Sequence, residues 1–499
     1  MIGGKRQALG KIKKTPSLRR AKIICTIGPA SSSDDMLGKM IRQGMDIARI
    51  NTSHSGASEV SRLVKNIRKI SRANNNNIAI ILDLQGPKIR IGGLAENIEL
   101  KSGQDIIFTT SKAAKQTAGQ GDPVVEVTYT KFIDDIREGG TIFIDDGLIE
   151  CKVKKIDKKA HTALCRIITG GILSSHKGIN LPDVYVSVDS VTKKDIKFLK
   201  LGIKLEVDFI AQSFVRSKKD IIRVKNEIGK ANSPIRVISK IEKHEAVSSF
   251  NSILEVSDAV MVARGDLGIE IEAEEVPSVQ KNIIKRDNLE GKTVITATQM
   301  LNSMIENPRP TRAEVSDVAN AIIDGSDAVM LSGETAIGKY PLKSLKMMVR
   351  IIKETEKTLD YDAILRNNAI LRKKLGMPHN TITEAISFAA CEIANILKVD
   401  AIISSTESGF TARQVSKNRP KSIIIGTSPN QWVVRQLMLS WGVVPLKTRS
   451  SKNIDSMIEE DIRAALDKNY INKKDTVVIT AGVLVNKPGS TNLINVREI

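Results

Sequence analysis

Charged and hydroxyl side chains follow the apolar runs of this sequence, and their types suit chemistry on a phosphate group. Lys240 and Glu242 end the run IRVISKIE, and Asp266 ends the run AVMVARGD. Arg49 lies in DIARINTS and Thr298 in TVITATQ. Because residues two apart in a strand point to the same face, Lys240 and Glu242 are expected to lie side by side.

Two carboxylates beside several strong cations suit a hard divalent ion that carries phosphate. Mg²⁺ takes one or two carboxylates and fills its octahedron with water and substrate oxygens. Lys and Arg neutralise the charge of a transferring phosphoryl group. An ion pair at a barrel rim would explain any one of these residues, but it does not explain the whole set at the ends of successive runs.

The apolar runs alternate with amphipathic segments that begin at Ser, Thr or Asp and end near Gly. Apolar residues at consecutive positions are typical of parallel strands buried on both faces. Eight such runs predict a (β/α)8 barrel, although an open doubly wound sheet has the same local pattern. No internal repeat is expected beyond this alternation. The runs cover 22–28, 46–53, 78–85, 209–215, 235–242, 259–266, 293–299 and 328–334.

A long interval between the third and fourth runs predicts an inserted domain. Residues 88–188 alternate short strand-like pieces with turns, which is typical of antiparallel β structure and suits a lid over a barrel mouth. The barrel domain is expected at 21–87 and 189–358. Residues 359–499 repeat a strand–helix pattern and predict a separate α/β domain with a mostly parallel sheet.

Composition and charge limit the classes of protein. The 499 residues are 41% hydrophobic and 26% charged, as in globular domains, and no apolar run is long enough for a membrane. With 76 Lys and Arg against 56 Asp and Glu, the net charge is +20, which first suggests nucleic acid. The basic residues are spread along the chain and aromatics are only 3%, so no nucleic-acid or membrane partner is predicted.

The cysteines and the N-terminus bear on location. Cys25, Cys151, Cys165 and Cys391 lie far apart, which favours buried thiols in a reducing compartment. The basic arm at 1–20 has no apolar segment of a secretory signal. A cytoplasmic location is therefore predicted, with organellar import left open.

Known nucleotide and zinc motifs do not fit. GETAIGKY (333–340) approaches a P-loop, but Tyr340 stands where Ser or Thr should ligate Mg²⁺. The sequence has no GxGxxG, no HExxH and no EF-hand loop. A zinc site and a P-loop nucleotide domain are not expected.

Longer motifs carry a family resemblance over residues 20–499. They are KIICTIGPAS, MDIARINTSH, DLQGPKIR, IFIDDGLI, KGINLP, ISKIE, VMVARGDLGIE, TATQML, NPRPTRAEVSDVANAI and DAVMLSGETAIGKYP. With these motifs the chain resembles the pyruvate kinase family. The resemblance implies a (β/α)8 TIM barrel with an inserted antiparallel β-barrel lid, a C-terminal α/β domain and a homotetramer. It also implies phosphoryl transfer from phosphoenolpyruvate to ADP, giving pyruvate and ATP, the last step of glycolysis.

The resemblance assigns roles to single residues. Lys240 would stabilise the transferring phosphoryl group, and Arg49 would hold its oxygens. Glu242 and Asp266 would ligate Mg²⁺ or Mn²⁺. Thr298 would lie near the carbon that is protonated when enolpyruvate becomes pyruvate.

Further contacts are implied for the substrate and the nucleotide. The backbone at Arg264 and Gly265, beside Asp266, would bind the substrate carboxylate. Nucleotide binding would fall to a set that includes lid residues: Asn51, His54, Arg90 and Lys177.

One motif departs from the family pattern. The monovalent-cation pocket of the family would correspond to Asn51, Ser53, Asp83 and Leu84. Potassium-dependent members read DTKGPEIR, whereas this chain reads DLQGPKIR with Lys88 in place of Glu. This resembles the potassium-independent subgroup, because an ammonium group can supply the charge of K⁺. A requirement for Mg²⁺ but not K⁺ is expected.

The C-terminal domain carries a predicted site for a phosphorylated effector. Turns rich in Ser, Thr and Gly ahead of a helix can form a phosphate nest. The candidate residues are Ser404, Ser405, Thr406, Ser408, Gly409, Thr411, Gly489 and Ser490.

Two other functions stay open at this point. A Mg²⁺-dependent barrel lyase or aldolase would share the acid pair but would not need the lid or Arg90 and Lys177. A nucleic-acid-binding or scaffold protein would use the +20 charge. An assay coupled to lactate dehydrogenase, with phosphoenolpyruvate, ADP and Mg²⁺, separates all three.

Overall fold

The computed structural model describes residues 19–53, 55–111, 121–182, 184–376, 381–482 and 491–499. Two compact units divide the described residues, one within 23–348 and the other within 349–499 together with residues 19–22. Each unit is described by itself. Within the described ranges, none of the helices combines the length and hydrophobicity that crossing a membrane requires.

The first unit is built on a closed barrel of eight parallel strands, which confirms the predicted barrel and rules out an open sheet. Most of the strands are buried along their whole length, as the continuous apolar runs predict. The strands are β1 (Lys22–Thr26), β2 (Ile47–Asn51), β3 (Ala79–Asp83), β12 (Phe209–Gln212), β13 (Arg236–Ile241), β14 (Ala259–Ala263), β15 (Thr293–Ala297) and β16 (Ala328–Leu331).

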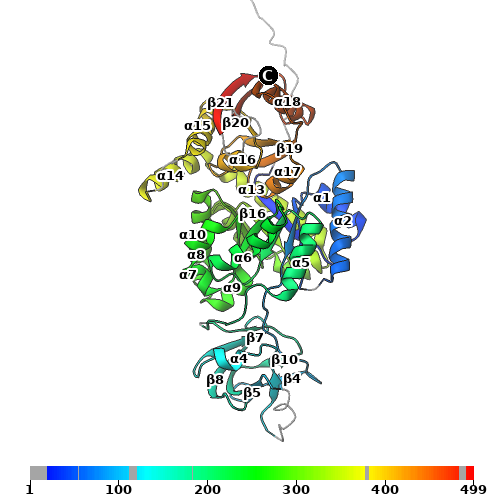
Figure 1. The fold of residues 1–499 in the computed structure, drawn as a ribbon, viewed down its shortest axis with the longest axis vertical. Coiled ribbons are helices and arrows are strands. Elements are labelled where there is room, and N and C mark those ends of the chain that lie inside the picture. Colours follow the sequence, from blue (N-terminus) through cyan, green and yellow to red (C-terminus); the bar gives the residue numbers. More distant parts are fainter. Residues whose placement is uncertain (1–18, 54, 112–120, 183, 377–380, 483–490) are drawn as a thin grey trace, which may run out of the picture. The chain divides into compact units, whose positions relative to one another are not determined.

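Helices lie around these strands in Figure 1. Several begin at the polar caps that the sequence suggests; Thr311, for example, accepts a hydrogen bond from the Glu314 backbone, and the Glu314 side chain accepts one from the Thr311 backbone. The helices are α1 (Asp34–Arg42), α2 (Ala57–Ala73), α5 (Lys193–Lys204), α6 (Lys218–Lys230), α7 (His244–Ser248), α8 (Phe250–Val256), α9 (Arg264–Glu270), α10 (Val276–Glu290), α11 (Arg312–Ile323), α12 (Gly333–Ala336) and α13 (Pro341–Thr358), with a 3₁₀ turn η1 (Asn302–Ile305).

A repeated aspartate fastens the barrel strands in pairs at their amino-terminal ends. Before every second strand, an aspartate accepts a hydrogen bond at Oδ2 from a backbone N–H of the preceding strand, and its own N–H donates to the carbonyl of that same residue. Each aspartate therefore closes a two-bond ring, here called an aspartate clamp. The clamps are Asp46 on Ile23 (2.7 Å), Asp208 on Ile80 (2.7 Å), Asp258 on Val237 (2.9 Å) and Asp327 on Val294 (2.8 Å).

The clamps correct the expectation that the sequence has no repeat beyond the strand–helix alternation. The motif SDAVM occurs at both 257–261 and 326–330, and MDIAR and VDFIA stand at the equivalent places at 45–49 and 207–211.

The insertion between β3 and β12 is a curled, mostly antiparallel sheet, as predicted. One detail differs from the expectation, because β5 and β6 pair in parallel. Its core is aliphatic, with Phe108 and Phe132 packed edge to face at 6.0 Å. Its elements are β4 (Ile98–Leu100), β5 (Asp105–Thr109), β6 (Val124–Glu126), α4 (Phe132–Asp135), β7 (Thr141–Ile144), β8 (Ile149–Asp157), β9 (Thr162–Thr169), β10 (Gly171–Leu173) and β11 (Ile179–Asn180).

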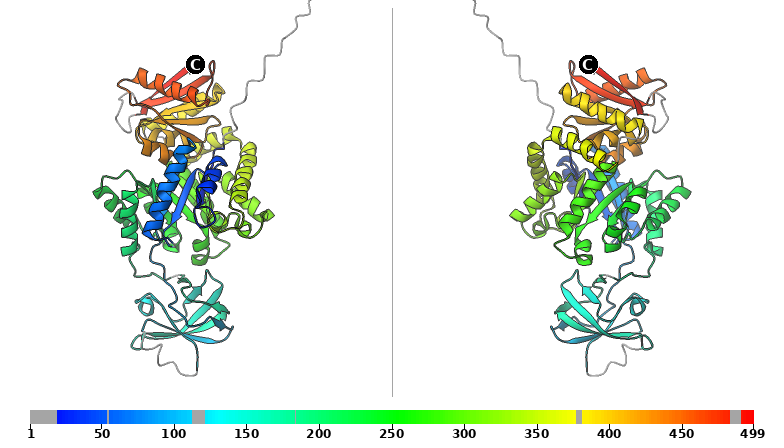
Figure 2. Two further views of the ribbon diagram at one scale, coloured as in Figure 1. Left: turned by 90° about the vertical axis from the view of Figure 1, so that its right-hand side faces the viewer. Right: turned by 90° about the vertical axis from the view of Figure 1, so that its left-hand side faces the viewer.

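The second unit has a sheet in the order β19-β18-β17-β20-β21, parallel except for β21, which confirms the predicted mostly parallel sheet. Ile402 and Ile424 pack with α15, α16 and α17, and Ile403 and Ile425 pack with α18, so both faces are covered (Figure 2). The elements are α14 (Tyr361–Lys374), α15 (Ile382–Ile396), β17 (Ala401–Ser405), α16 (Phe410–Ser416), β18 (Ile423–Ser428), α17 (Gln431–Gln436), η2 (Leu437–Leu439), β19 (Val443–Lys447), α18 (Ile454–Asp467), β20 (Thr476–Gly482) and β21 (Thr491–Glu498). The exact domain boundaries given above stay predictions.

Candidate active site

A buried ion network joins the carboxyl ends of three barrel strands. Lys240 of β13 places Nζ 2.6 Å from Glu242 Oε1 and 3.4 Å from Asp83 Oδ1 at the end of β3. Arg49 of β2 donates from Nε to Asp83 Oδ2 at 2.7 Å and from Nη1 to the Thr26 hydroxyl at 3.0 Å. Arg49, Asp83, Lys240 and Glu242 therefore lie together, as expected if strand ends converge.

Two neighbouring residues complete this network. The Ser213 hydroxyl, just after β12, accepts a hydrogen bond from Lys240 Nζ at 2.7 Å. The backbone N–H of Phe214 donates to Glu242 Oε2 at 2.8 Å. Phe214 has φ 54°, in the left-handed region, and this turn aims its N–H at the carboxylate. The sequence analysis missed both residues, although the run 209–215 contains them.

The charges of the network compensate one another inside the protein. Only 8% of Lys240 and 1% of Glu242 are exposed. Burial by itself would lower the pKa of Lys240, but the carboxylates of Asp83 and Glu242 outweigh it and raise that pKa. Burial by itself would raise the pKa of Asp83, but Lys240 and Arg49 lower it. Lys240 is therefore a cation and Asp83 an anion at neutral pH.

Glu242 behaves differently because a second acid lies near it. Burial raises the pKa of Glu242, its ion pair with Lys240 opposes the rise, and the charge of Asp266 adds to it. The net direction is upward. A divalent cation between Glu242 and Asp266 would remove this repulsion, so the acid pair fits the ion that the sequence predicts. No group of three or more His, Cys, Asp or Glu suited to a metal occurs among the described residues.

Thr298 lies in a strained turn that is held from several sides. Its φ is 67°, and that of Gln299 is 54°; non-glycine residues in this region cost about 1–3 kcal/mol. Gly265 N–H donates to the Thr298 hydroxyl at 2.7 Å. The Arg264 guanidinium donates to the Thr298 carbonyl at 2.8 Å and pairs with Asp317 at 2.6 Å. The side chain of Arg264 thus supports the turn that presents Thr298.

The predicted nucleotide residues on the insertion have partners within it. Arg90 donates from Nη1 to the His176 carbonyl at 2.7 Å. Lys177 pairs with Asp145 at 2.8 Å. In the described part of the chain, neither side chain forms a hydrogen bond or ion pair with the ion network, and His54 lies outside the described residues.

The residues of the predicted monovalent-cation pocket lie at the neighbouring carboxyl ends of β2 and β3, where Asn51 is paired with Asp83. Asn51 Oδ1 accepts a hydrogen bond from Ser53 N–H at 3.0 Å. The Leu84 carbonyl accepts one from the Ser213 hydroxyl at 2.8 Å, which ties the pocket to the Lys240 network. Lys88 is exposed and lines a small cavity with Phe214 and residues of the insertion.

Comparison with known proteins decides the family. A family model described as the barrel domain of pyruvate kinase matches residues 18–345, and one described as its alpha/beta domain matches residues 384–497. The chain belongs to the pyruvate kinase family. Among its relatives, the pyruvate kinases of Sporosarcina psychrophila and Geobacillus stearothermophilus are each 44% identical, over 97% and 96% of this chain and 81% and 80% of their own length. That of Staphylococcus aureus (strain MRSA252) is 43% identical over 97% of this chain and 81% of its own.

The family fixes the activity. The protein is a phosphotransferase (EC 2.7.1.40) that moves a phosphoryl group from phosphoenolpyruvate to ADP with the aid of a divalent metal, giving pyruvate and ATP. The prediction of a pyruvate kinase is thereby confirmed, in preference to the lyase and the scaffold protein that charge and barrel alone left open.

The described candidate effector residues of this pyruvate kinase lie in the strand β17, in the turn that follows it and at the start of the helix α16. Ser404 is buried in β17, and its hydroxyl shares a hydrogen bond with Thr480 at 2.9 Å. The Thr411 hydroxyl shares one with Thr491. Thr406, Ser408 and Gly409 form the turn before α16, with φ 79° at Gly409. Gly489 and Ser490 lie outside the described residues.

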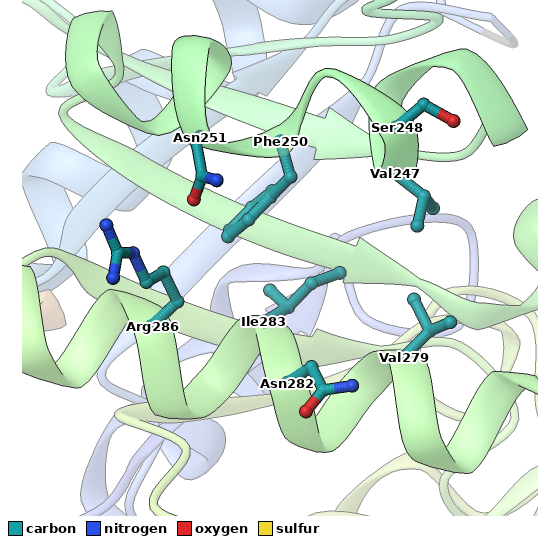
Figure 3. Close-up of a pocket in the computed structure, with 8 residues that line it drawn as sticks. All are labelled: Val247, Ser248, Phe250, Asn251, Val279, Asn282, Ile283 and Arg286. Carbon is teal, nitrogen blue, oxygen red and sulfur yellow. The ribbon is translucent and has the colours of Figure 1, made fainter. Parts of the chain in front are cut away.

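A cavity of about 410 Å³ lies in the helical layer of the barrel unit, between α7–α8 and α10. Figure 3 shows Phe250 from one side pointing toward Ile283 on the other. Val247 and Val279 add apolar surface, and Ser248, Asn251, Asn282 and Arg286 are polar. None of the predicted site residues lines it.

Proposed function

We propose that Lys240, Arg49, Glu242 and Asp266 carry the phosphoryl transfer of this pyruvate kinase. The buried network around Lys240 is the observation that supports the proposal most. It keeps Lys240 charged and fixes it beside a second cation, Arg49, at one end of the barrel. Fixed positive charge stabilises a metaphosphate-like phosphoryl group with little reorganisation.

Glu242 and Asp266 are proposed as the ligands of Mg²⁺ or Mn²⁺. When bound, the ion would neutralise charge on the carboxylate and phosphoryl oxygens of the substrate. Burial raises the pKa of Glu242 and the negative charge of Asp266 adds to the rise, and this repulsion between the two acids supports the assignment. The Phe214 N–H keeps the Glu242 carboxylate oriented.

Gly265 and Thr298 are proposed to contact the carboxylate and the methylene carbon of phosphoenolpyruvate. The hydrogen bond between them and the support of Arg264 hold this part of the site in one shape. Gly265 N–H would exchange its contact with Thr298 for the substrate carboxylate, leaving the Thr298 hydroxyl beside the carbon that receives a proton.

Lys240→Met tests the central assignment. Turnover should fall by roughly 10²–10⁴-fold with a smaller change in KM, because a positioned charge acts mainly in the transition state. The assay is the one coupled to lactate dehydrogenase, with circular dichroism to check folding. Lys197→Met, at an exposed position of α5, is the matched control and should keep full turnover. A variant at Lys240 that changed KM alone would contradict the assigned role.

We also propose that the enzyme works without K⁺. The exposed Lys88, five residues after Asp83, supports this proposal. Its ammonium group can supply the positive charge that K⁺ would otherwise bring to the predicted cation pocket. In tetramethylammonium buffer the rate should be the same with and without K⁺, and Lys88→Glu should create a K⁺ requirement. A large loss of wild-type rate without K⁺ would refute the proposal.

We also propose, from the family resemblance, that the nucleotide is bound by Asn51, His54, Arg90 and Lys177. Arg90 and Lys177 belong to the insertion, so motion of the insertion would bring their charges to the nucleotide phosphates.

A phosphorylated effector at 404–411 and a homotetramer are proposed as well. The left-handed turn at Gly409 leads into α16, and turns of this kind can direct backbone N–H groups toward an anion. Ile382 and Ile396 of α15 are 71% and 74% exposed, and apolar surface of this kind supports contact with another subunit. A cytoplasmic location stays a prediction.

A further inference from the structure

The chain crosses between the barrel and the insertion twice, and one turn of the barrel contacts both crossings. The turn covers residues 213–216 and follows β12. At its start, the Ser213 hydroxyl donates to the Leu84 carbonyl at 2.8 Å, where the chain leaves β3 for the insertion. At its end, Arg216 donates to the segment 184–190, through which the chain comes back to the barrel and which is here called the return segment.

The side chain of Arg216 binds the backbone of the return segment with two donors. Its Nη1 donates to the Val186 carbonyl, and its Nη2 donates to the Val188 carbonyl at 2.6 Å. The guanidinium carbon also lies 5.3 Å from the centre of the Tyr185 ring. The planar fork of a guanidinium suits two carbonyls at once, whereas a lysine ammonium is a compact charge without that fork. These contacts fix the return segment to the barrel.

The return segment is also fixed to the insertion. Val184 and Val186 are buried in the core of the insertion, and Val188 packs against that core. Asp135 of α4 accepts hydrogen bonds from the N–H and the hydroxyl of Ser187, both at 2.8 Å. A displacement of the insertion therefore acts on the segment that Arg216 holds.

On the barrel side, the turn orients a carboxylate of the proposed metal site. Phe214 N–H donates to Glu242 Oε2 at 2.8 Å, and only the fully buried Val215 separates Phe214 from Arg216. The Arg216 N–H donates to Asp220 at 2.9 Å, which fixes the end of the turn to the start of α6. The guanidinium that holds the return segment is thus two residues away from the N–H that orients Glu242.

We propose that Arg216 is a positioning residue, which links the place of the insertion to the orientation of Glu242. The inference rests on the proposed function, in which Glu242 ligates the divalent metal. When the insertion moves, the return segment displaces the Arg216 guanidinium, and the turn shifts the Phe214 N–H that orients the carboxylate. Metal binding and the place of the insertion are therefore coupled, and removal of the guanidinium uncouples them.

Hydrogen exchange of the Phe214 amide in the whole enzyme tests the link without an activity assay. In Arg216→Met the protection of this amide should fall by about tenfold or more, because the turn loses its contact with the return segment. The Ser187 amide is a control within the same molecule, and its protection should stay at the wild-type level, since its acceptor Asp135 belongs to the insertion. Exchange is followed by mass spectrometry at amide resolution. Unchanged protection of Phe214, or equal losses at both amides, would overturn the proposal.

Mn²⁺ binding tests the consequence for the metal site and can be measured from the electron paramagnetic resonance signal of the free ion. The dissociation constant should rise by about tenfold in Arg216→Met, because outer contacts orient metal ligands. Glu242→Gln is the reference for the proposed function. Weaker binding in Glu242→Gln but not in Arg216→Met would refute the link and leave the metal assignment intact. Unchanged binding in Glu242→Gln would refute the metal assignment, and the exchange of the Phe214 amide would then decide the link by itself.

Arg216→Lys separates the fork of the side chain from its charge. It should restore neither the protection of Phe214 nor the affinity for Mn²⁺, and it carries the test if Arg216→Met does not fold. Full recovery would overturn the proposal, because positive charge alone would then be sufficient.

Arg223→Met is the matched control on α6. Arg223 pairs with Asp189 of the same return segment at 3.3 Å, but both side chains are exposed, and exposed ion pairs contribute little. The variant should keep wild-type exchange, Mn²⁺ binding and turnover. Losses equal to those of Arg216→Met would show that the effect is not specific to Arg216 and would overturn the proposal.

Discussion

Asp461 of α18 is a single carboxyl that makes the stability of the C-terminal unit depend on pH. Only 1% of the residue is exposed, and the hydroxyls of Ser405, Thr427 and Thr448 approach it from the ends of three neighbouring strands. Burial raises its pKa to about 6, although the hydroxyl hydrogen bonds act in the opposite direction. The folded state therefore binds this proton more tightly than the unfolded state does.

Asp461→Asn should remove this dependence. In the wild type the contribution is complete below about pH 4 and is lost by about pH 6, so the variant should be more stable above that pH, by up to about 3 kcal/mol. Calorimetric melts across a pH series measure the difference. Asp467→Asn, at the exposed end of the same helix, is the control and should follow the wild-type profile. Parallel pH profiles for Asp461→Asn and the wild type would contradict the prediction.

For single residues, the sequence predicts some of the contacts in the candidate site and misses others, for a physical reason. Lys240 and Glu242 are two residues apart in a strand, and Arg49 and Asp83 end other strands of the same barrel, so periodicity and topology bring them together. Phe214 contributes a backbone N–H through a left-handed φ, which its residue type does not favour.

The connection from β3 to the insertion shows how one glycine supports the site. Gly86 has φ 68°, and its N–H donates to Asp195, which also caps α5. A Cβ at Gly86 would lie 2.6 Å from Phe214 Cδ2 and 3.2 Å from Ser213 Cβ. The glycine thus lets the strand end pass close to the turn that contacts Lys240 and Glu242.

Gly86→Ala should damage both stability and catalysis. The backbone conformation and the clash together should cost roughly 1–3 kcal/mol of unfolding free energy. Displacement of Phe214 and Ser213 should also lower turnover, because both residues orient the Lys240–Glu242 pair. Thermal melts and the coupled assay provide the two measurements.

Gly229→Ala is the matched control for that change. Gly229 lies in α6 with open space around its Cβ position, so alanine should be neutral or stabilising by up to about 1 kcal/mol and should leave turnover unchanged. Equal behaviour of the two variants would show that Gly86 has no special structural task.

For the whole molecule, the sequence predicts architecture more completely than detail. Continuous apolar runs predict the buried strands of the barrel, and the interrupted spacing after the third run predicts the insertion. The parallel pairing of β5 with β6 does not follow from an alternating pattern, since that pattern is the same for either direction. Two of the four aspartate clamps lie in a repeated SDAVM motif, but only the hydrogen bonds show what the repeat does.

The clamp of Asp208 on Ile80 has a consequence for how this architecture can change. It joins β3 to β12, the two strands between which the chain leaves to build the insertion, and Arg68 reinforces it at the barrel's amino-terminal end. Closing a longer loop adds only about 0.6 kcal/mol per doubling of its length. Because this clamp holds β3 and β12 together independently of the insertion, and because lengthening a loop costs little, we expect the insertion to tolerate changes in length without opening the barrel.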